Sequence, residues 1–118
     1  MAGVLKKTTG LTGLAVARNP EHKLRVLYGK ILKVLKKAPP NAAYRKYTEE
    51  IVQNRLQAVI DSKNYEEIEK KVNCGQVEEL IKQAEQELLL ARKFVIWKPW
   101  EPLVNQAPPN QWTWPPNN

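Results

Sequence analysis

The sequence predicts an all-α protein: a small antiparallel three-helix bundle with a short extra helix, followed by an extended tail rich in tryptophan and proline. Apolar residues recur at helical spacing over several segments, and no segment shows the alternation of a strand. Pro39-Pro40 and Asn73-Cys74-Gly75 separate these segments, because both strings interrupt helices. The composition then changes at Ile96. We divide the chain into a basic N-terminal arm (1–19), a helical bundle (20–95) and a docking tail (96–118).

The N-terminal arm contains no acidic residue between Ala2 and Asn19, and it contains several lysine, threonine and glycine residues. A basic, hydroxylated and acid-poor segment is typical of a mitochondrial import sequence. The same composition would also suit a flexible, solvated arm. The sequence leaves both interpretations open.

The first helix is expected to begin at Asn19-Pro20. Asparagine can cap free backbone N–H groups, and proline in the first turn of a helix loses no hydrogen bond. Pro39-Pro40 should end the helix, since the residue before a proline avoids the helical conformation. Lysine and arginine occupy much of the outer face. The predicted core face consists of Leu24, Leu27, Tyr28, Ile31, Leu32 and Leu35.

A second helix is expected to run from Asn41, as its cap, to about Ser62. The predicted core stripe consists of Tyr44, Tyr47, Ile51, Leu56, Val59 and Ile60.

Two further helices follow. Asn64 is expected to cap a short helix from Tyr65 to Val72, with Tyr65, Ile68 and Val72 facing inward. Gly75 favours a turn, because glycine readily adopts the positive φ that ends a helix. The last helix, Gln76 to about Val95, is predicted to bury Val77, Leu80, Ile81, Ala84, Leu88, Ala91 and Val95.

The segment from Ile96 to Asn118 holds all four tryptophans and six of the nine prolines. Prolines forbid a regular helix or a central strand, so we expect an extended chain. Because full burial of one large apolar side chain contributes roughly 2–3 kcal/mol, the rings should either cover the bundle or anchor the chain to another protein. The partner-docking candidates are Arg45, Lys46, Trp97, Trp100, Trp112 and Trp114.

The composition argues against several classes of function. With one cysteine, Cys74, and one histidine, His22, the chain can form neither a multi-thiolate metal site nor a histidine pair. Adjacent glutamates such as Glu49-Glu50 point about 100° apart on a helix and do not converge on one atom. No apolar run approaches the roughly 18 residues of a membrane span. We therefore expect no catalytic residue, no cofactor and no transmembrane segment.

Positive charge is concentrated in the front half of the chain. The net charge is +7, and residues 1–47 contain eleven of the 19 basic residues but one acidic residue, Glu21. Such a surface could meet nucleic acid, anionic lipid or an acidic protein. A mitochondrial RNA-binding or ribosome-associated protein is therefore the alternative function. No recognisable RNA-binding module surrounds the basic residues, and the tryptophans lie far from them in sequence.

Four strings are more specific than helical periodicity requires: Asn41–Glu49, Gln83–Glu85, Leu90–Lys93 and Trp97–Leu103. In these strings the sequence resembles the complex I alpha-subcomplex subunit 5 family, and the resemblance extends from Thr8 to Pro115. It implies a non-catalytic helical subunit of mitochondrial NADH:ubiquinone oxidoreductase (complex I) without a redox cofactor.

The resemblance also implies where the protein lies and what it contacts. We expect a peripheral position on the matrix side of the inner membrane, in a hetero-oligomer with other complex I subunits. One expected neighbour is a core subunit of the peripheral arm near the quinone-reducing region. Nucleic acid is not an expected partner under this interpretation.

Overall fold

The computed structural model describes residues 6–115, and this part of the chain forms four α-helices and no β-strand. No helix within it is long and apolar enough to cross a membrane. The predicted all-α fold with one short extra helix is confirmed. The helices are α1 (Pro20–Leu35), α2 (Ala43–Asp61), α3 (Tyr65–Val72) and α4 (Val77–Trp97).

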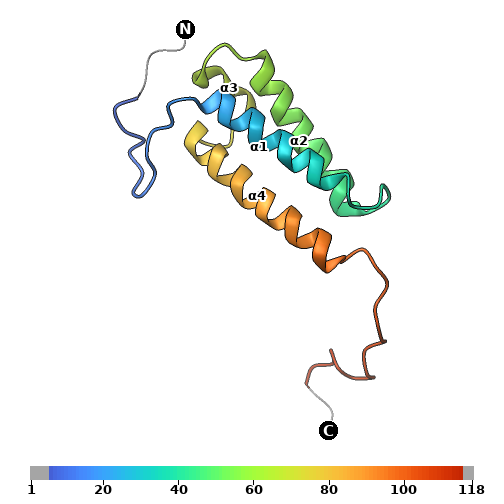
Figure 1. The fold of residues 1–118 in the computed structure, drawn as a ribbon. Helices are drawn as coiled ribbons and strands as arrows, with labels where there is room; N and C mark the ends of the chain where they lie inside the picture. The colour runs from blue at the N-terminus through green and yellow to red at the C-terminus, as the bar shows by residue number, and fades with distance from the viewer. Residues whose placement is uncertain (1–5, 116–118) are drawn as a thin grey trace.

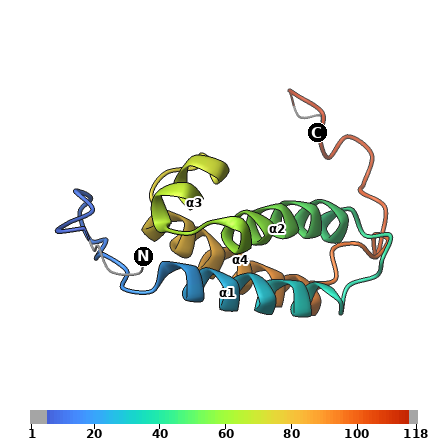
Figure 2. The same cartoon turned by 90° about the horizontal axis from the view of Figure 1, so that it is seen from above.

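The central helix is α1, which packs against both α2 and α4. Figure 1 shows α1 between its two neighbours, with α2 antiparallel to it and α4 parallel to it. The short α3 connects α2 to α4 across one end of the bundle. Figure 2 shows that the N-terminal arm lies at that end, while the tail leaves from the opposite end.

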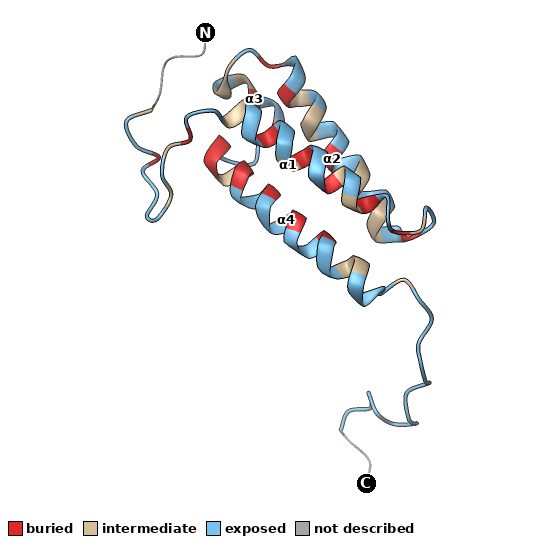
Figure 3. Ribbon diagram, in the orientation of Figure 1, coloured by how far each residue is buried: buried red, intermediate tan, exposed pale blue. Residues whose placement is uncertain are grey.

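The hydrophobic core lies where α1 faces α2 and α4. Leu24, Tyr28, Ile31 and Leu35 of α1 are each at most 2% exposed, and the buried segments of the three long helices face one another (Figure 3). The predicted core faces of α1 and α4 are therefore confirmed, except that Leu27, Leu32 and Val95 are only half-buried. The buried residues of α4 that were predicted are Val77, Leu80, Ile81, Ala84, Leu88 and Ala91.

The start of α1 lies at Pro20 as expected, but the Asn19 side chain makes no capping hydrogen bond. The prediction that Asn41 caps α2 is wrong, because the residue at that position is Ala42. The backbone N–H of Ala42 donates to the carbonyl of Pro39 at 3.0 Å. This hydrogen bond closes the turn after Pro39-Pro40, so α2 begins two residues later than Asn41.

The ends of α3 and α4 follow the local sequence closely. The Asn64 side chain accepts a hydrogen bond from the Glu67 N–H at 3.0 Å, as a cap should. Asn73 ends α3 in the left-handed conformation with φ 56°. At Gly75, where φ is +100°, a Cβ atom would collide with the Glu79 carboxylate. That carboxylate accepts from the Gln76 N–H at 2.9 Å and so closes the first turn of α4.

The predicted core stripe of α2 is largely wrong. Thr48, Val52 and Val59 are buried, whereas Tyr47, Ile51 and Ile60 are 68%, 53% and 49% exposed. Apolar residues lie on more than one side of α2, so periodicity alone does not select the buried side. The buried side is the one that packs against α1. On that side Thr48, rather than a larger apolar side chain, takes a buried position.

We predict that two adjacent substitutions separate these two sides of α2. Val52→Ala removes buried methyl groups and should lower the free energy of unfolding by about 2 kcal/mol. Ile51→Ala changes an exposed side chain, so its effect should stay within about 0.5 kcal/mol. Thermal melting of the two purified variants measures the difference. A larger loss for Ile51→Ala than for Val52→Ala would contradict the observed orientation of α2.

Candidate docking surfaces

The distal tryptophans, Trp112 and Trp114, lie in the tail without burial. They are 86% and 87% exposed, and Leu103 and Val104 between them and the bundle are 76% and 96% exposed. The tail from residue 98 to residue 115 contains neither helix nor strand and projects away from the bundle (Figure 3). Rings of this size are rarely left in water without a binding role.

The proximal tryptophans lie against the end of the bundle. Trp97 is the last residue of α4, so the helix continues two residues beyond the predicted end at Val95. The Trp97 ring is 5.9 Å from the Phe94 ring and remains 60% exposed. Trp100 is half-buried. The two proximal rings are thus partly covered by their own chain, whereas the two distal rings are almost fully exposed.

Arg45 is not the free surface charge that its sequence position suggested. Its Nη1 donates to the backbone carbonyl of Ala38 at 2.6 Å, and its Nε donates to Glu49 at 2.7 Å. The first bond crosses from α2 to the loop after α1. Arg45 therefore holds the α1–α2 connection, and reversing its charge would disturb folding as well as any docking contact.

Lys46 and Tyr47 both face solvent. The exposure of Lys46 leaves this docking candidate accessible, but Tyr47 was expected to face the core. Tyr44, its partner in that prediction, is half-buried and donates a hydrogen bond from its hydroxyl to Glu87 of α4 at 2.5 Å. Its ring also meets Phe94 edge-on, with the ring centroids 4.3 Å apart. Burial and the bond to Glu87 hold the pKa of the Tyr44 hydroxyl well above its ordinary value.

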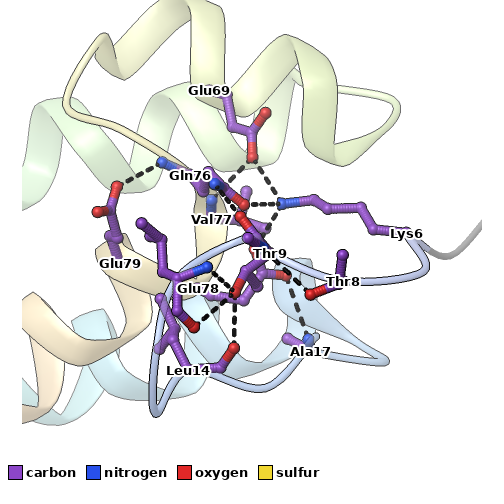
Figure 4. A network of polar contacts seen from close by, with 12 residues as sticks. Lys6, Thr8, Thr9, Leu14, Ala17, Glu69, Gln76, Val77, Glu78 and Glu79 are labelled. Carbon is purple, nitrogen blue, oxygen red and sulfur yellow. Dashed lines mark hydrogen bonds and ion pairs between the residues drawn. The ribbon is translucent and has the colours of Figure 1, made fainter.

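A polar network between the N-terminal arm and the start of α4 was not predicted (Figure 4). Lys6 Nζ lies 2.5 Å from the carboxylate of Glu78, 3.2 Å from that of Glu69 and 3.0 Å from the amide oxygen of Gln76. Glu78 is only 3% exposed. Its second carboxylate oxygen accepts from the Ala17 N–H at 3.1 Å.

Residues 6–19 of the arm are therefore held against the bundle, which disagrees with a solvated, flexible conformation for this part of the arm. The Gln76 side chain also donates to the carbonyl of Thr9 at 2.7 Å, so the arm is held at both Lys6 and Thr9. Thr9 is itself buried and donates to the carbonyl of Leu14 at 2.7 Å, which closes a compact turn. A role of this segment in mitochondrial import stays a prediction.

The electrostatics of the pair favour its charged form. Burial acts to raise the pKa of the Glu78 carboxyl, but hydrogen bonds from Lys6 and from the Ala17 N–H outweigh it and leave that pKa lowered. Burial acts to lower the pKa of Lys6, but hydrogen bonds to Glu78 and Glu69 raise it overall. Glu78 also lies in the first turn of α4, where the helix dipole favours a negative charge.

No group of three or more histidine, cysteine, aspartate or glutamate side chains in residues 6–115 is placed to hold a metal ion. Cys74 is free and exposed. Among the docking candidates, the exposed groups that could contact another macromolecule are the tail tryptophans and Lys46.

The chain is similar in sequence to known proteins. The sequence pattern of a family described as "ETC complex I subunit conserved region" matches residues 13–79. The chain is 56% identical to the Bos taurus protein named NADH dehydrogenase (ubiquinone) 1 alpha subcomplex subunit 5, over 98% of this chain and 99% of the bovine one. It is 51% identical to the probable subunit of that name from Caenorhabditis elegans, over 93% of this chain and 73% of the nematode one.

We predict that the arm–α4 network makes stability depend on pH. The pKa of Glu78 is lowered in the folded chain, so its contribution is complete above the ordinary value of 4.5 and is lost as the pH falls through the folded value. The pKa of Lys6 is raised, so its contribution is complete below 10.5 and is lost as the pH rises through the folded value. Glu78→Gln should therefore lower the free energy of unfolding by about 1–2 kcal/mol near pH 7, and by less in acid.

Melting curves at pH 7 and at about pH 3 measure this difference. Glu85→Gln, which changes an exposed glutamate of the same helix, is the matched control and should have little effect at either pH. A destabilisation by Glu78→Gln that is equal at both pH values would show that the carboxylate charge does not hold the arm.

Proposed function

Because this chain belongs to the family of NADH dehydrogenase (ubiquinone) 1 alpha subcomplex subunit 5, we propose that it is a non-catalytic accessory subunit on the matrix-side, peripheral arm of mitochondrial respiratory complex I. In this role it supports electron transfer from NADH to ubiquinone by holding its neighbours in place, and it carries no electrons itself. It is a peripheral protein of the inner membrane and works as part of a hetero-oligomer.

The observation that carries this proposal is the likeness to the bovine subunit over nearly the whole length of both chains. A likeness of that extent includes the arm, the bundle and the tail. It therefore supports a shared assembly and a shared way of docking into it. The proposed neighbours are other complex I subunits, including a core subunit of the peripheral arm near the quinone-reducing region.

The exposed rings of the tail supply the physical means of docking. Trp112 and Trp114 have no contact within residues 6–115 that buries them, so a partner could bury both rings without removing either from a contact with the bundle. We assign the docking contacts to Lys46, Trp97, Trp100, Trp112 and Trp114. Arg45, the sixth candidate, acts indirectly because its guanidinium is bonded to Ala38 and Glu49.

A second candidate function is favoured by the exposed lysines on the outer face of α1. Lys23, Lys30, Lys33 and Lys37 are exposed, and the ion pairs found in residues 6–115 include none of them. A mitochondrial RNA-binding or ribosome-associated protein could use this face for phosphate contacts. The one tyrosine of α1, Tyr28, is 2% exposed and the helix contains no tryptophan or phenylalanine, so this face offers no exposed ring of these types on which bases could stack.

One experiment separates the two functions. Mitochondria that contain the tagged full-length chain are solubilised gently and run on a native gel, with and without ribonuclease. We expect the chain to migrate with NADH dehydrogenase activity in both lanes. Migration with a ribonuclease-sensitive particle, away from that activity, would overturn the proposed function.

We predict that the distal tryptophans act mainly in docking, whereas the proximal ones, which also pack on their own chain, contribute mainly to folding. Trp112→Ala with Trp114→Ala should leave the melting temperature of the free chain unchanged. It should also release the subunit from complex I under mild salt, since each buried ring typically contributes 2 kcal/mol or more, roughly thirtyfold in affinity. The matched variant, Trp97→Ala with Trp100→Ala, should instead lower the melting temperature.

Melting of the purified variants and native-gel retention give the two readouts. The distal variant decides the issue. If it melts at a lower temperature while its retention stays normal, the tail covers its own bundle and is not the docking element.

A further inference from the structure

The three long helices leave an open groove between α2 and α4. Both helices pack on α1 but meet each other only through long side chains, such as Arg55 with Gln83 at 2.9 Å. The groove has a volume of about 940 Å³. Tyr28 and Ile31 of α1 contribute to its lining, together with Ile51 from α2 and Leu90 from α4.

The Tyr28 hydroxyl in this groove donates a hydrogen bond to no acceptor among residues 6–115. The residue is 2% exposed, and among the buried side-chain nitrogen and oxygen atoms of residues 6–115 this hydroxyl alone is unpaired. Buried polar groups are nearly always hydrogen-bonded, so each exception calls for an explanation. A ring without the hydroxyl would fill the same space in the core. The unpaired hydroxyl therefore points to a group that is supplied from outside the chain.

The charges around the groove indicate what that group is. Burial raises the pKa of Tyr28, and the nearby Arg55 guanidinium acts in the opposite direction. Arg55 uses one nitrogen for Gln83, and its other terminal nitrogen has only the weak acceptor Cys74 Sγ at 3.5 Å. Lys82 adds a second, exposed cation to the same lining.

The two carboxylates of the lining are already engaged. Glu79 accepts from the Gln76 N–H at the start of α4, and Glu87 accepts from the Tyr44 hydroxyl. The groove thus offers a hydroxyl, a guanidinium and an ammonium group as donors, and each of its two carboxylates already accepts a hydrogen bond from within the chain. Ile51 and Leu90, which are 53% and 37% exposed, add apolar surface at its edges.

We infer that the groove receives an acidic side chain of a neighbouring protein subunit, whose carboxylate binds Arg55 and accepts the hydrogen bond of the Tyr28 hydroxyl. This inference rests on the proposed function, which places the chain among other subunits. The Arg55–Gln83 hydrogen bond opens as the carboxylate enters. Apolar residues next to the acidic residue pack on Ile51 and Leu90.

Tyr28→Phe tests the inference because it removes the hydroxyl and keeps the ring. The loss of an unpaired buried hydroxyl should leave the melting temperature of the free full-length chain unchanged or higher. Retention in complex I should weaken about tenfold, as expected for the loss of one charge-assisted hydrogen bond. Tyr65→Phe, which removes a hydroxyl from α3 outside the groove, is the matched control and should have no effect on retention.

Arg55 and Lys82 provide a second, independent readout. Arg55→Gln should weaken retention, and Arg55→Lys should restore part of it because the positive charge returns. Carbodiimide coupling of intact complex I should join Lys82 to an aspartate or glutamate of another subunit. The exposed Lys70 of α3, which lies outside the groove, should not couple to that same residue.

The outcomes separate the two proposals. If the wild-type chain does not migrate with complex I, the proposed function itself fails. If it does migrate there, but Tyr28→Phe and Arg55→Gln are retained like the wild type and Lys82 forms no cross-link, then the groove holds only solvent and the inference is wrong.

Discussion

The apolar face of α1 is the constraint on which the rest of the structure depends. Both long neighbours pack on this helix rather than on each other, so Leu24, Tyr28, Ile31 and Leu35 serve two interfaces at once. A helix with neighbours on two sides leaves the third region, between α2 and α4, without a close packing partner. The open groove and the unpaired Tyr28 hydroxyl both follow from this arrangement, as does the exposed basic side of α1.

A chain of 118 residues has too few apolar side chains to cover every face of its helices. Residues outside the three long helices supply part of the core. Ile68 of α3 is fully buried, and the N-terminal arm brings Ala17 into the core. The remaining apolar side chains, at the outer side of α2 and along the tail, stay exposed. A subunit that is completed by its neighbours accounts for both facts, because burial of those side chains then contributes to assembly rather than to folding.

The features that could be predicted from the sequence are those that local patterns decide. The core faces of α1 and α4 each form one apolar stripe, and Asn64 caps α3 through a bond to a residue three positions away. The buried side of α2 could not be predicted, because Val52 and Ile51 offer competing stripes.

The Lys6–Glu78 pair joins residues 72 positions apart, so only the folded chain brings them together. A lysine in an acid-free arm and a glutamate at the start of a helix gave, at most, a hint of that pairing. The contact of Arg45 with the loop could not be predicted for a similar reason, since one of its two acceptors is the backbone carbonyl of Ala38. The docking role of the tail cannot be decided within one chain, because its acceptor is another molecule.

The central claim is that neighbouring subunits cover the apolar surface that this chain leaves exposed. Hydroxyl-radical footprinting of the free chain and of the same chain within intact complex I measures that coverage at individual side chains. The account predicts that Trp112, Trp114, Ile51 and Leu90 react readily in the free chain and are strongly protected in the complex, while buried Leu24 is unreactive in both. Equal reactivity of these four side chains in the two states would contradict the account.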